Sequence, residues 1–188
     1  MYLTQNEEVR LLGLTTSGAR MAITTTASND TTAGTEVSGG LYARRAVAFN
    51  AASSGSITNS DTILFIELPA CNAMCWELWS ADGTQRRWWG YFSPTAATWS
   101  SDVFTAAAHG RVTGSPIVFF GTAPTGLTAG TTYYVREPTT DTFKISATNG
   151  GSAVSVAGTG SATFGRVIAI PAGESLQIDA GQLILALS

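Results

Sequence analysis

The residues able to bind metals or to act as nucleophiles are few in this sequence. Cys71 and Cys75 are its two cysteines, and His109 is its single histidine. A structural zinc site needs four nitrogen or sulfur ligands, which these residues cannot supply within one chain. On a regular strand the two cysteines would lie about 13 Å apart on one face, too far for a disulfide, although a turn could bring them together. We predict two buried thiols that behave as apolar side chains, with no metal site and no cofactor.

Catalytic combinations of side chains are equally scarce. His109 lies in an Ala-His-Gly segment typical of a turn, and no Gly-x-Ser-x-Gly motif accompanies it. Glu67 and Glu77 could face each other across strands like a glycosidase pair, but we expect such a carboxylate to bond to the backbone. The glycine-rich segments 149–151 and 157–162 lack the strand–loop–helix context of a phosphate site and predict hairpin turns. We therefore predict that the protein is not an enzyme.

Arginine and large aromatic side chains are concentrated in residues 86–92. In a regular strand, Arg86 and Trp88 would lie on one face, and Arg87, Trp89 and Tyr91 on the other. Both faces then carry large rings, so one faces the core and the other needs a cover, either from this chain or from a neighbouring subunit. Tryptophan, tyrosine and arginine are also frequent at binding hot spots. The candidate interface or ligand contacts are Arg86, Arg87, Trp88, Trp89, Tyr91, Trp99, Tyr133 and Tyr134.

The composition narrows the class of protein further. The chain has 188 residues and a net charge of −3, and only 12% of its residues are charged, about half the usual fraction. It lacks the basic stripe that nucleic-acid binding needs, and no apolar run is long enough to span a membrane. Its start has no basic region before an apolar stretch, so no signal peptide is expected. A mean hydropathy of +0.15 with so few charges favours a permanent homo-oligomer over a free monomer.

Short β-strands separated by turns account for most of the sequence. Thr4 and Glu7 form a capping-box pattern, which predicts a short helix ending at Gly13, or else a frayed arm. The apolar run Ile63–Leu68 predicts a strand buried on both faces, and Asp82-Gly83 predicts a hairpin. The remaining expected strands are Arg20–Thr25, Tyr42–Phe49, Met74–Trp79, Arg86–Phe92, Val167–Ile170, Ser175–Ile178 and Leu183–Leu187.

The middle of the chain has a turn-rich pattern of its own. Apolar and polar residues alternate around Tyr133 and Val135 and again around Phe143 and Ile145, as in a sheet with one solvent-exposed face. We predict a small β module at 99–166, displayed at the surface and inserted into a domain made of 1–98 plus 167–188. The predicted fold class is all-β: a jelly-roll-like β sandwich, which forms the assembly domain, with a small inserted β domain.

Several motifs resemble a family of small tailed-bacteriophage virion proteins, usually labelled tail fibre or minor structural proteins. The resemblance covers most of residues 34–92 and 167–188. The middle segment resembles a separate phage-associated β module. The histidines of two family motifs have no counterpart here, so no role is transferred for them. The motifs are Gly34–Phe49 with its Glu-Val-Ser-Gly-Gly sequence, Ala51–Ser60, Ile63–Leu68, Cys75–Gly83 and Ile170–Ser188, and for the module Ala108–Gly110, Gly130–Val135 and Asp141–Ser146.

The resemblance implies a non-enzymatic structural protein of the virion, assembled in the cytoplasm of the host bacterium. It leaves head decoration and a tail or fibre position open. The expected partners are further copies of the chain, as a trimer by analogy, and other virion proteins, with no nucleic acid and no membrane insertion. The alternative is a carbohydrate-binding module that recognises a host surface glycan through exposed aromatic rings at Trp99, Tyr133 and Tyr134.

Overall fold

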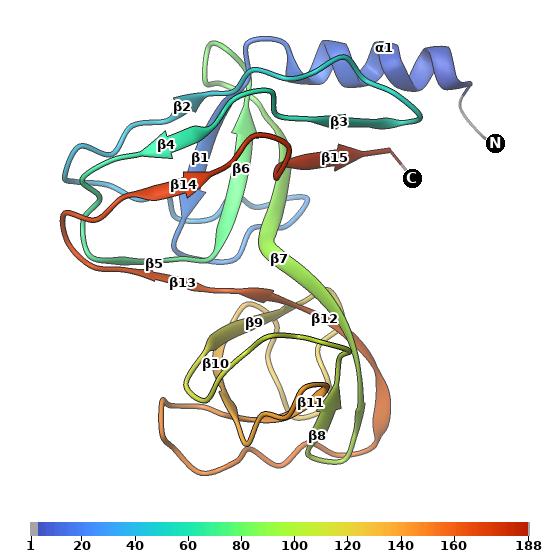
Figure 1. Ribbon diagram of the computed structural model, residues 1–188, viewed down its shortest axis with the longest axis vertical. Coiled ribbons are helices and arrows are strands. Elements are labelled where there is room, and N and C mark those ends of the chain that lie inside the picture. The colour runs from blue at the N-terminus through green and yellow to red at the C-terminus, as the bar shows by residue number, and fades with distance from the viewer. Residues whose placement is uncertain (1–3, 188) are drawn as a thin grey trace.

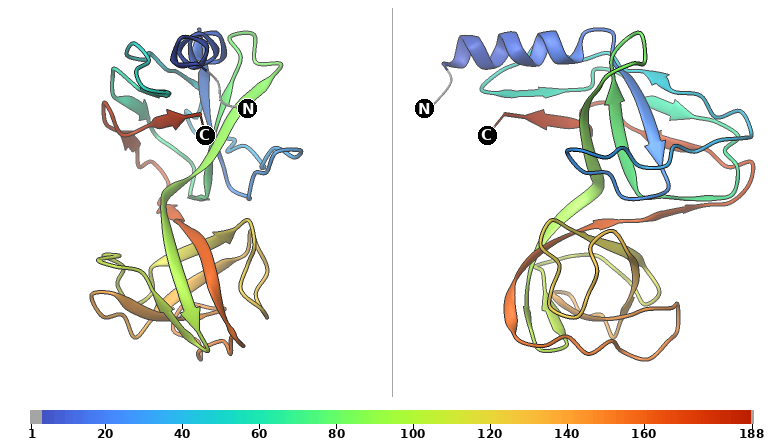
Figure 2. Two further views of the ribbon diagram at one scale, coloured as in Figure 1. Left: turned by 90° about the vertical axis from the view of Figure 1, so that its right-hand side faces the viewer. Right: turned by 180° about the vertical axis from the view of Figure 1, so that it is seen from behind.

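Two β-structured lobes joined by one long strand make up the computed structural model, which describes residues 4–187. The upper lobe of Figure 1 is a sandwich and the lower lobe is a barrel. Strand β7 (Arg86–Ser100) runs through both, with its first half in the sandwich and its second half in the barrel. Figure 2 shows that the chain crosses between the lobes only along β7 and on its return from β12. The all-β fold class is confirmed.

One layer of the sandwich is an antiparallel sheet in the order β2-β1-β6-β7. The other layer is a ribbon in which residues 56–73 pair with the C-terminal segment running the opposite way. Buried side chains from both layers, among them Ile23, Phe65 and Leu78, form one core between them. The strands are β1 (Arg20–Thr24), β2 (Arg45–Ala46), β3 (Ser56–Thr58), β4 (Ile63–Phe65), β5 (Cys71–Ala73), β6 (Cys75–Trp79), β13 (Ile168–Ile170), β14 (Leu176–Ile178) and β15 (Ile184–Ala186).

The barrel closes because β7 pairs with both ends of the sheet order β12-β9-β10-β11-β8. Closure leaves the sheet no free edge, and the interior of such a small barrel is filled by side chains. Four phenylalanine rings in mutual contact occupy it, each at most 1% exposed. They are Phe104, Phe119, Phe143 and Phe164. The strands are β8 (Val103–Thr105), β9 (Pro116–Phe120), β10 (Thr132–Arg136), β11 (Thr142–Ser146) and β12 (Thr159–Arg166).

A third, smaller apolar cluster joins the two lobes. Met74, Cys75 and Tyr91 of the sandwich meet Val118 of the barrel and Val167 of the return segment. This cluster is separate from the two lobe cores. Ala97 lies in the barrel core, so the barrel begins before residue 98 along β7, and the predicted division into 1–98 plus 167–188 and 99–166 stays a prediction.

Helix α1 (Gln5–Thr16) confirms the capping pattern but not the predicted end. The Thr4 hydroxyl accepts a hydrogen bond from the Glu7 amide, whereas the Glu7 carboxylate binds Arg10. The expectation of an end at Gly13 is wrong, since the helix continues for three more residues. A glycine inside a helix costs only about 1 kcal/mol, and burial of Leu12 and Thr16 outweighs that cost.

Two strand expectations and one turn expectation are also corrected. In Ile63–Leu68 only Ile63, Phe65 and Leu68 are buried and strand β4 ends at Phe65, because the ribbon is an outer layer with one face in solvent. The expected strand Tyr42–Phe49 is reduced to the two residues of β2, which lies at the edge of its sheet. Segment 157–162 is not wholly a turn, because β12 begins at Thr159. Gly160 lies under the Trp99 ring, where a Cβ would come within 2.4 Å of the indole.

Candidate functional site

The aromatic segment 86–92 is the first candidate, and a β-bulge decides how its side chains are distributed. The register between β6 and β7 shifts between Leu78 and Trp79, so that Trp79 lies opposite Arg86 and Glu77 lies opposite Trp89. Arg86 therefore shares a face with Trp89 rather than with Trp88. The predicted regular alternation is wrong at this end of the strand, because the extra residue in the bulge reverses it.

A buried carboxylate organises this face of the sheet. Glu77 is 1% exposed, and its Oε1 accepts hydrogen bonds from Ser28 Oγ (2.8 Å), the Gly34 amide (2.9 Å) and Arg86 Nη1 (3.1 Å). Its Oε2 accepts from Trp79 Nε1 at 3.0 Å. A buried carboxylate with this many donors is a structural group. The bond from the Gly34 amide confirms the expectation that Glu77 bonds to the backbone. Together these hydrogen bonds hold loop 25–36 against the sheet.

The same loop supplies the cover that the aromatic face needs. Trp89 Nε1 donates to Asp30 Oδ1 at 3.0 Å, and Arg86 donates to the carbonyl oxygens of Asn29 and Thr32. Tyr91 stacks on Phe120 of the barrel, with ring centroids 4.1 Å apart and planes at 6°. Its side chain is 6% exposed, and burial raises the pKa of its hydroxyl. These three residues serve packing within the chain.

The other face of the segment belongs to the sandwich core. Trp88 packs against that core, as does Phe92, and Gly90 lies beneath the ring of Trp76 from the neighbouring strand. Arg87 is exposed and donates to the carbonyl oxygen of Leu14 near the end of helix α1, at 3.3 Å. A cation near the C-terminus of a helix is favourable.

The three aromatic residues expected on the barrel do not form one exposed surface. Trp99 is half-buried, and its ring lies across Gly160. The expectation that Tyr133 is exposed is wrong, because it is 7% exposed and its hydroxyl accepts a hydrogen bond from the Thr128 amide. Tyr134 is half-buried, on the opposite side of β10 from Tyr133.

Most of the potential catalytic groups are buried or make structural contacts. His109 is buried, and its two ring nitrogens bond to the carbonyl oxygen of Thr142 and the amide of Arg111. Cys71 and Cys75 are free, and the expectation that both are buried holds for Cys75 but is wrong for Cys71, which is half-buried. Burial raises the pKa of both thiols, which favours their protonated form. Glu67 is exposed. Within residues 4–187 no three His, Cys, Asp or Glu side chains form a group able to hold a metal ion.

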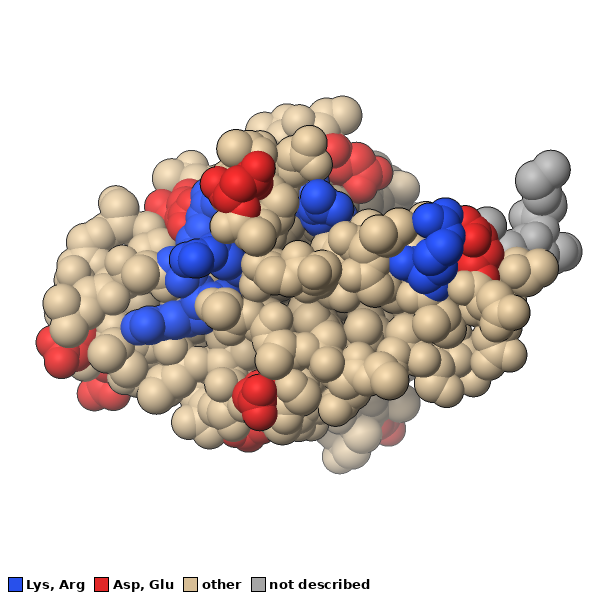
Figure 3. All heavy atoms as spheres, turned by 90° about the horizontal axis from the view of Figure 1, so that it is seen from above, with Lys and Arg blue, Asp and Glu red and all other residues tan. Residues whose placement is uncertain are grey.

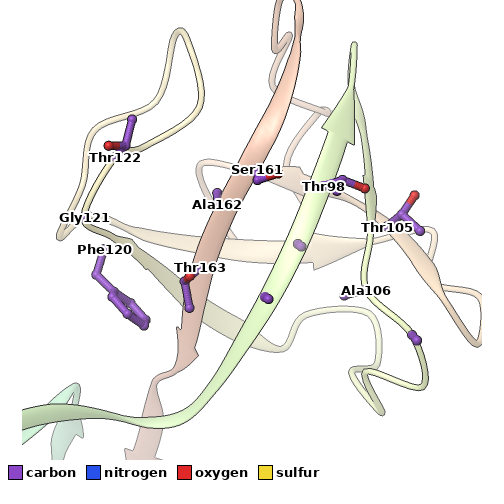
Figure 4. A pocket seen from close by; sticks show the side chains of 12 residues that line it. Thr98, Thr105, Ala106, Phe120, Gly121, Thr122, Ser161, Ala162 and Thr163 are labelled. Atoms are coloured by element: carbon purple, nitrogen blue, oxygen red, sulfur yellow. The ribbon is translucent and has the colours of Figure 1, made fainter. Parts of the chain in front are cut away.

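The surface has three notable hollows. The first, of about 550 Å³, lies on the barrel (Figure 4), where β7, β8, β9 and β12 present mainly alanine and threonine side chains. The second, of about 480 Å³, opens where β7 leaves the sandwich and is lined by Trp76 and Arg166 among others. The third, of about 450 Å³, lies between helix α1 and residues 47–52. No charged side chain lines the first hollow, so it offers no acid or base.

Most of the remaining surface is neutral. Seen from above in Figure 3, basic side chains lie in a few small groups beside acidic ones, further acidic side chains lie alone, and the rest of the surface is uncharged. Large exposed apolar side chains concentrate on the sandwich, with only Val103 and Val112 belonging to the barrel. No helix in the described part of the chain is long and apolar enough to cross a membrane. The exposed apolar residues of the sandwich are Val9, Leu14, Leu41, Leu64, Ile66 and Ile184.

Comparison with known proteins identifies the family. Residues 15–111, just over half of the chain, match the family of the podophage GP4 fiber I protein gp80. The chain belongs to this phage fibre family. The match begins in helix α1 and continues past β8 into the barrel, so it does not mark a boundary near residue 98. No curated protein matches the chain, and no solved structure does either.

Membership of the fibre family confirms the coarser part of the sequence-based interpretation. The chain is a structural protein of a phage virion, of tail-fibre type. Sequence reasoning did not find the bulge after Leu78, the hydrogen bonds around Glu77 or the second hollow, where β7 leaves the sandwich. The sequence marked Glu77 as an acid that bonds to the backbone but not its other partners, whereas the bulge leaves no signal in the residue types.

Proposed function

We propose that this fibre-family chain is a non-enzymatic building block that forms a homo-oligomer and docks on the phage particle through its sandwich lobe. The observation that carries the proposal is the uneven distribution of exposed apolar side chains. Among residues 4–187, six of the eight large ones lie on the sandwich and its helix, where Leu14 is 56% and Ile184 is 60% exposed. Burying such surface against a partner is favourable by roughly 25 cal/mol per Å².

The barrel suits a displayed position. Its strands close into a ring, so no strand edge is open to pairing with another chain. Its own filled core and the apolar joint around Tyr91 and Phe120 would hold it at a fixed angle to the sandwich. In this arrangement residues 99–166 face outward. The family membership favours a fibre over head decoration, and a trimer remains our expected symmetry by analogy with other β-rich viral appendages.

The distribution of apolar side chains does not favour the carbohydrate module expected on the barrel. That function would need an exposed group of aromatic rings, and Trp99, Tyr133 and Tyr134 do not supply one. We therefore place assembly first, with the chain associating with its own copies and with other virion proteins in the host cytoplasm.

Light scattering coupled to size exclusion tests the proposal on the full chain. We expect a mass near three times the 19.5 kDa of one chain. The variants Leu14→Gln and Leu64→Thr should shift the oligomer towards monomer. Val112→Thr on the barrel, where the side chain is 67% exposed, is the control and should leave the mass unchanged. A wild-type chain that stays monomeric at high concentration, or a control as disruptive as the sandwich variants, would overturn the proposal.

A further inference from the structure

The sandwich, unlike the barrel, has a strand whose outer edge is open, and this strand is β15. On its β3 side, the carbonyl oxygen of Leu183 accepts a hydrogen bond from the Asn59 amide. The Leu187 amide donates to the carbonyl oxygen of Gly55 on the same side. Antiparallel partners exchange hydrogen bonds at every second residue, so Leu185 also faces β3.

The backbone groups on either side of Leu185 therefore point away from β3. Ile184 and Ala186 are exposed, and within residues 4–187 neither makes a backbone hydrogen bond on that outer side. Figures 1 and 2 show no strand of the described chain beside β15 on the side away from β3. The N–H and carbonyl groups of both residues are thus open to a further strand.

The edge of β15 lacks the features that usually prevent strand pairing. Natural edge strands are protected by a charge, a proline or a bulge. Leu183–Leu187 reads Leu-Ile-Leu-Ala-Leu, with no charge and no proline, and its register with β3 is regular. The far side of β3 differs, because residues 50–53 form hydrogen bonds to it. Of this pair of strands, β15 is the one with an unprotected edge.

The hollow of about 480 Å³ lies along this edge. Its lining includes Leu183, which is buried, and Ile184, whose side chain points to the opposite face and is 60% exposed. A hollow that meets both faces of a strand opens at the edge of that strand. The lining also includes the apolar side chains of Trp76 and Phe92 from the sheet. A strand added to β15 would place every second side chain against this apolar lining.

The chemistry of the edge restricts its occupant to an extended segment. Alternating backbone donors and acceptors are satisfied by another strand about 4.8 Å away, as in β-strand addition. The open side of β15 faces the barrel lobe (Figure 1), which the joint around Tyr91 and Phe120 attaches to the sandwich. The approach is therefore narrower for a folded domain than for a single strand. The apolar hollow favours a segment with an apolar residue at every second position.

We propose that an extended segment of another virion protein adds to the open edge of β15 and thereby docks this chain on the particle. The segment forms hydrogen bonds with the backbone of Ile184 and Ala186, and its apolar side chains fill the hollow beside Trp76. This inference rests on the proposed docking through the sandwich lobe and names the way in which it occurs. The exposed side chains of Leu14 and Leu64 are then left for contacts between copies of the chain.

Amide exchange tests whether the edge is open in the free chain and occupied in the virion. In the purified chain, the Ile184 and Ala186 amides should exchange at least about tenfold faster than the Leu185 amide, which faces β3. In purified virions, the segment that contains β15 should exchange at least about tenfold more slowly than in the purified chain.

Variants introduced into the phage test the role of the edge in docking. Ala186→Pro removes an N–H that points away from β3, so it leaves the β3–β15 hydrogen bonds in place. It should lower the copies of the chain per particle, or the yield of particles, at least about tenfold. Ala186→Ser keeps the N–H and is the matched control, with an unchanged copy number by quantitative mass spectrometry. Ile184→Lys adds a charge at a side chain that is 60% exposed and should also reduce incorporation, without the backbone effect of proline.

Light scattering on the same variants separates docking from association between copies. An unchanged oligomer that no longer joins the particle supports the inference, whereas failure of Leu14→Gln and Leu64→Thr bears only on the contacts between copies. An oligomer that dissociates in Ala186→Pro would place a second copy on the edge and overturn the inference. Protected Ile184 and Ala186 amides in the purified chain would also overturn it. So would incorporation of Ala186→Pro and Ile184→Lys at the wild-type level, or a bare β15 edge in a reconstruction of the virion.

Discussion

Replacing Glu77 with glutamine should destabilise the sandwich more than any other removal of a single charge. The carboxylate accepts four hydrogen bonds in a site that is 1% exposed, and one of its donors is Arg86, whose side chain is only 12% exposed. Glutamine has one acceptor oxygen in place of two. If that oxygen stays with Ser28, Gly34 and Arg86, the new amide group points its hydrogens at the Trp79 N–H.

The size of the effect follows from the partner left behind. Removing one member of a buried ion pair costs about 3–5 kcal/mol, and Arg86 belongs at the lower end because two carbonyl oxygens still accept from it. At about 2–4 °C per kcal/mol for a chain of this size, a loss near 3 kcal/mol lowers the unfolding temperature by about 6–12 °C. Calorimetry or denaturant titration measures both quantities.

A control and a local measurement make the prediction specific. Glu36 pairs with Arg44, but the side chains are 30% and 25% exposed, so Glu36→Gln should cost about 1 kcal/mol or less. Amide exchange at Gly34 should rise in Glu77→Gln because the loop loses its anchor. Equal losses in the two variants, or unchanged exchange at Gly34, would refute the view that Glu77 holds loop 25–36.

Three further predictions concern the barrel and the buried titratable groups. Gly160→Val should destabilise the chain by about 1–3 kcal/mol in denaturant titration, since a Cβ would come within 2.4 Å of Trp99; an unchanged midpoint would contradict that packing. Cys75 should resist thiol reagents at neutral pH until denaturant unfolds the chain, because burial raises its pKa. Burial also raises the pKa of Tyr42 and Tyr91, so their contribution is complete below about pH 10, the unfolded value, and falls as the pH rises further. Replacing both by phenylalanine should reduce the loss of unfolding temperature at alkaline pH, and an unaltered pH profile would contradict the assignment.

Local signals in the sequence predicted the individual elements well. The Thr4–Glu7 pattern found the start of helix α1, and the Asp82-Gly83 pair found the hairpin between β6 and β7. Both are set by interactions within a few residues. Alternation around Tyr133 and Phe143 found β10 and β11, because one side of each strand faces the barrel interior.

Errors arose where distant parts of the chain meet. The helix continues past Gly13 because Leu12 and Thr16 are buried against the sandwich, which a local stop signal does not show. Ile63–Leu68 resembles a strand with two buried faces, yet Leu64 and Ile66 are exposed because no further layer covers the ribbon. In each case tertiary packing overrides local propensity.

The candidate site shows the same division. Residue types alone marked the segment 86–92 as important, and every side chain in it that sequence reasoning singled out makes a defined contact, including the exposed Arg87. Which contacts they make depends on the bulge after Leu78. One additional residue reverses the faces of a strand, and no residue type announces it.

By itself, the sequence determined the class of the molecule. Few charges, abundant hydroxyl-bearing and small residues, and short apolar runs between turns allow only a β-rich chain with a neutral surface. The tertiary structure decided that β7 serves two lobes, that β7 and β12 close a barrel, and that Trp76 and Asp179 line the same hollow. These features join residues up to about a hundred positions apart. Strand pairing over such distances depends on the packing of the whole chain, whereas composition and turn signals act locally.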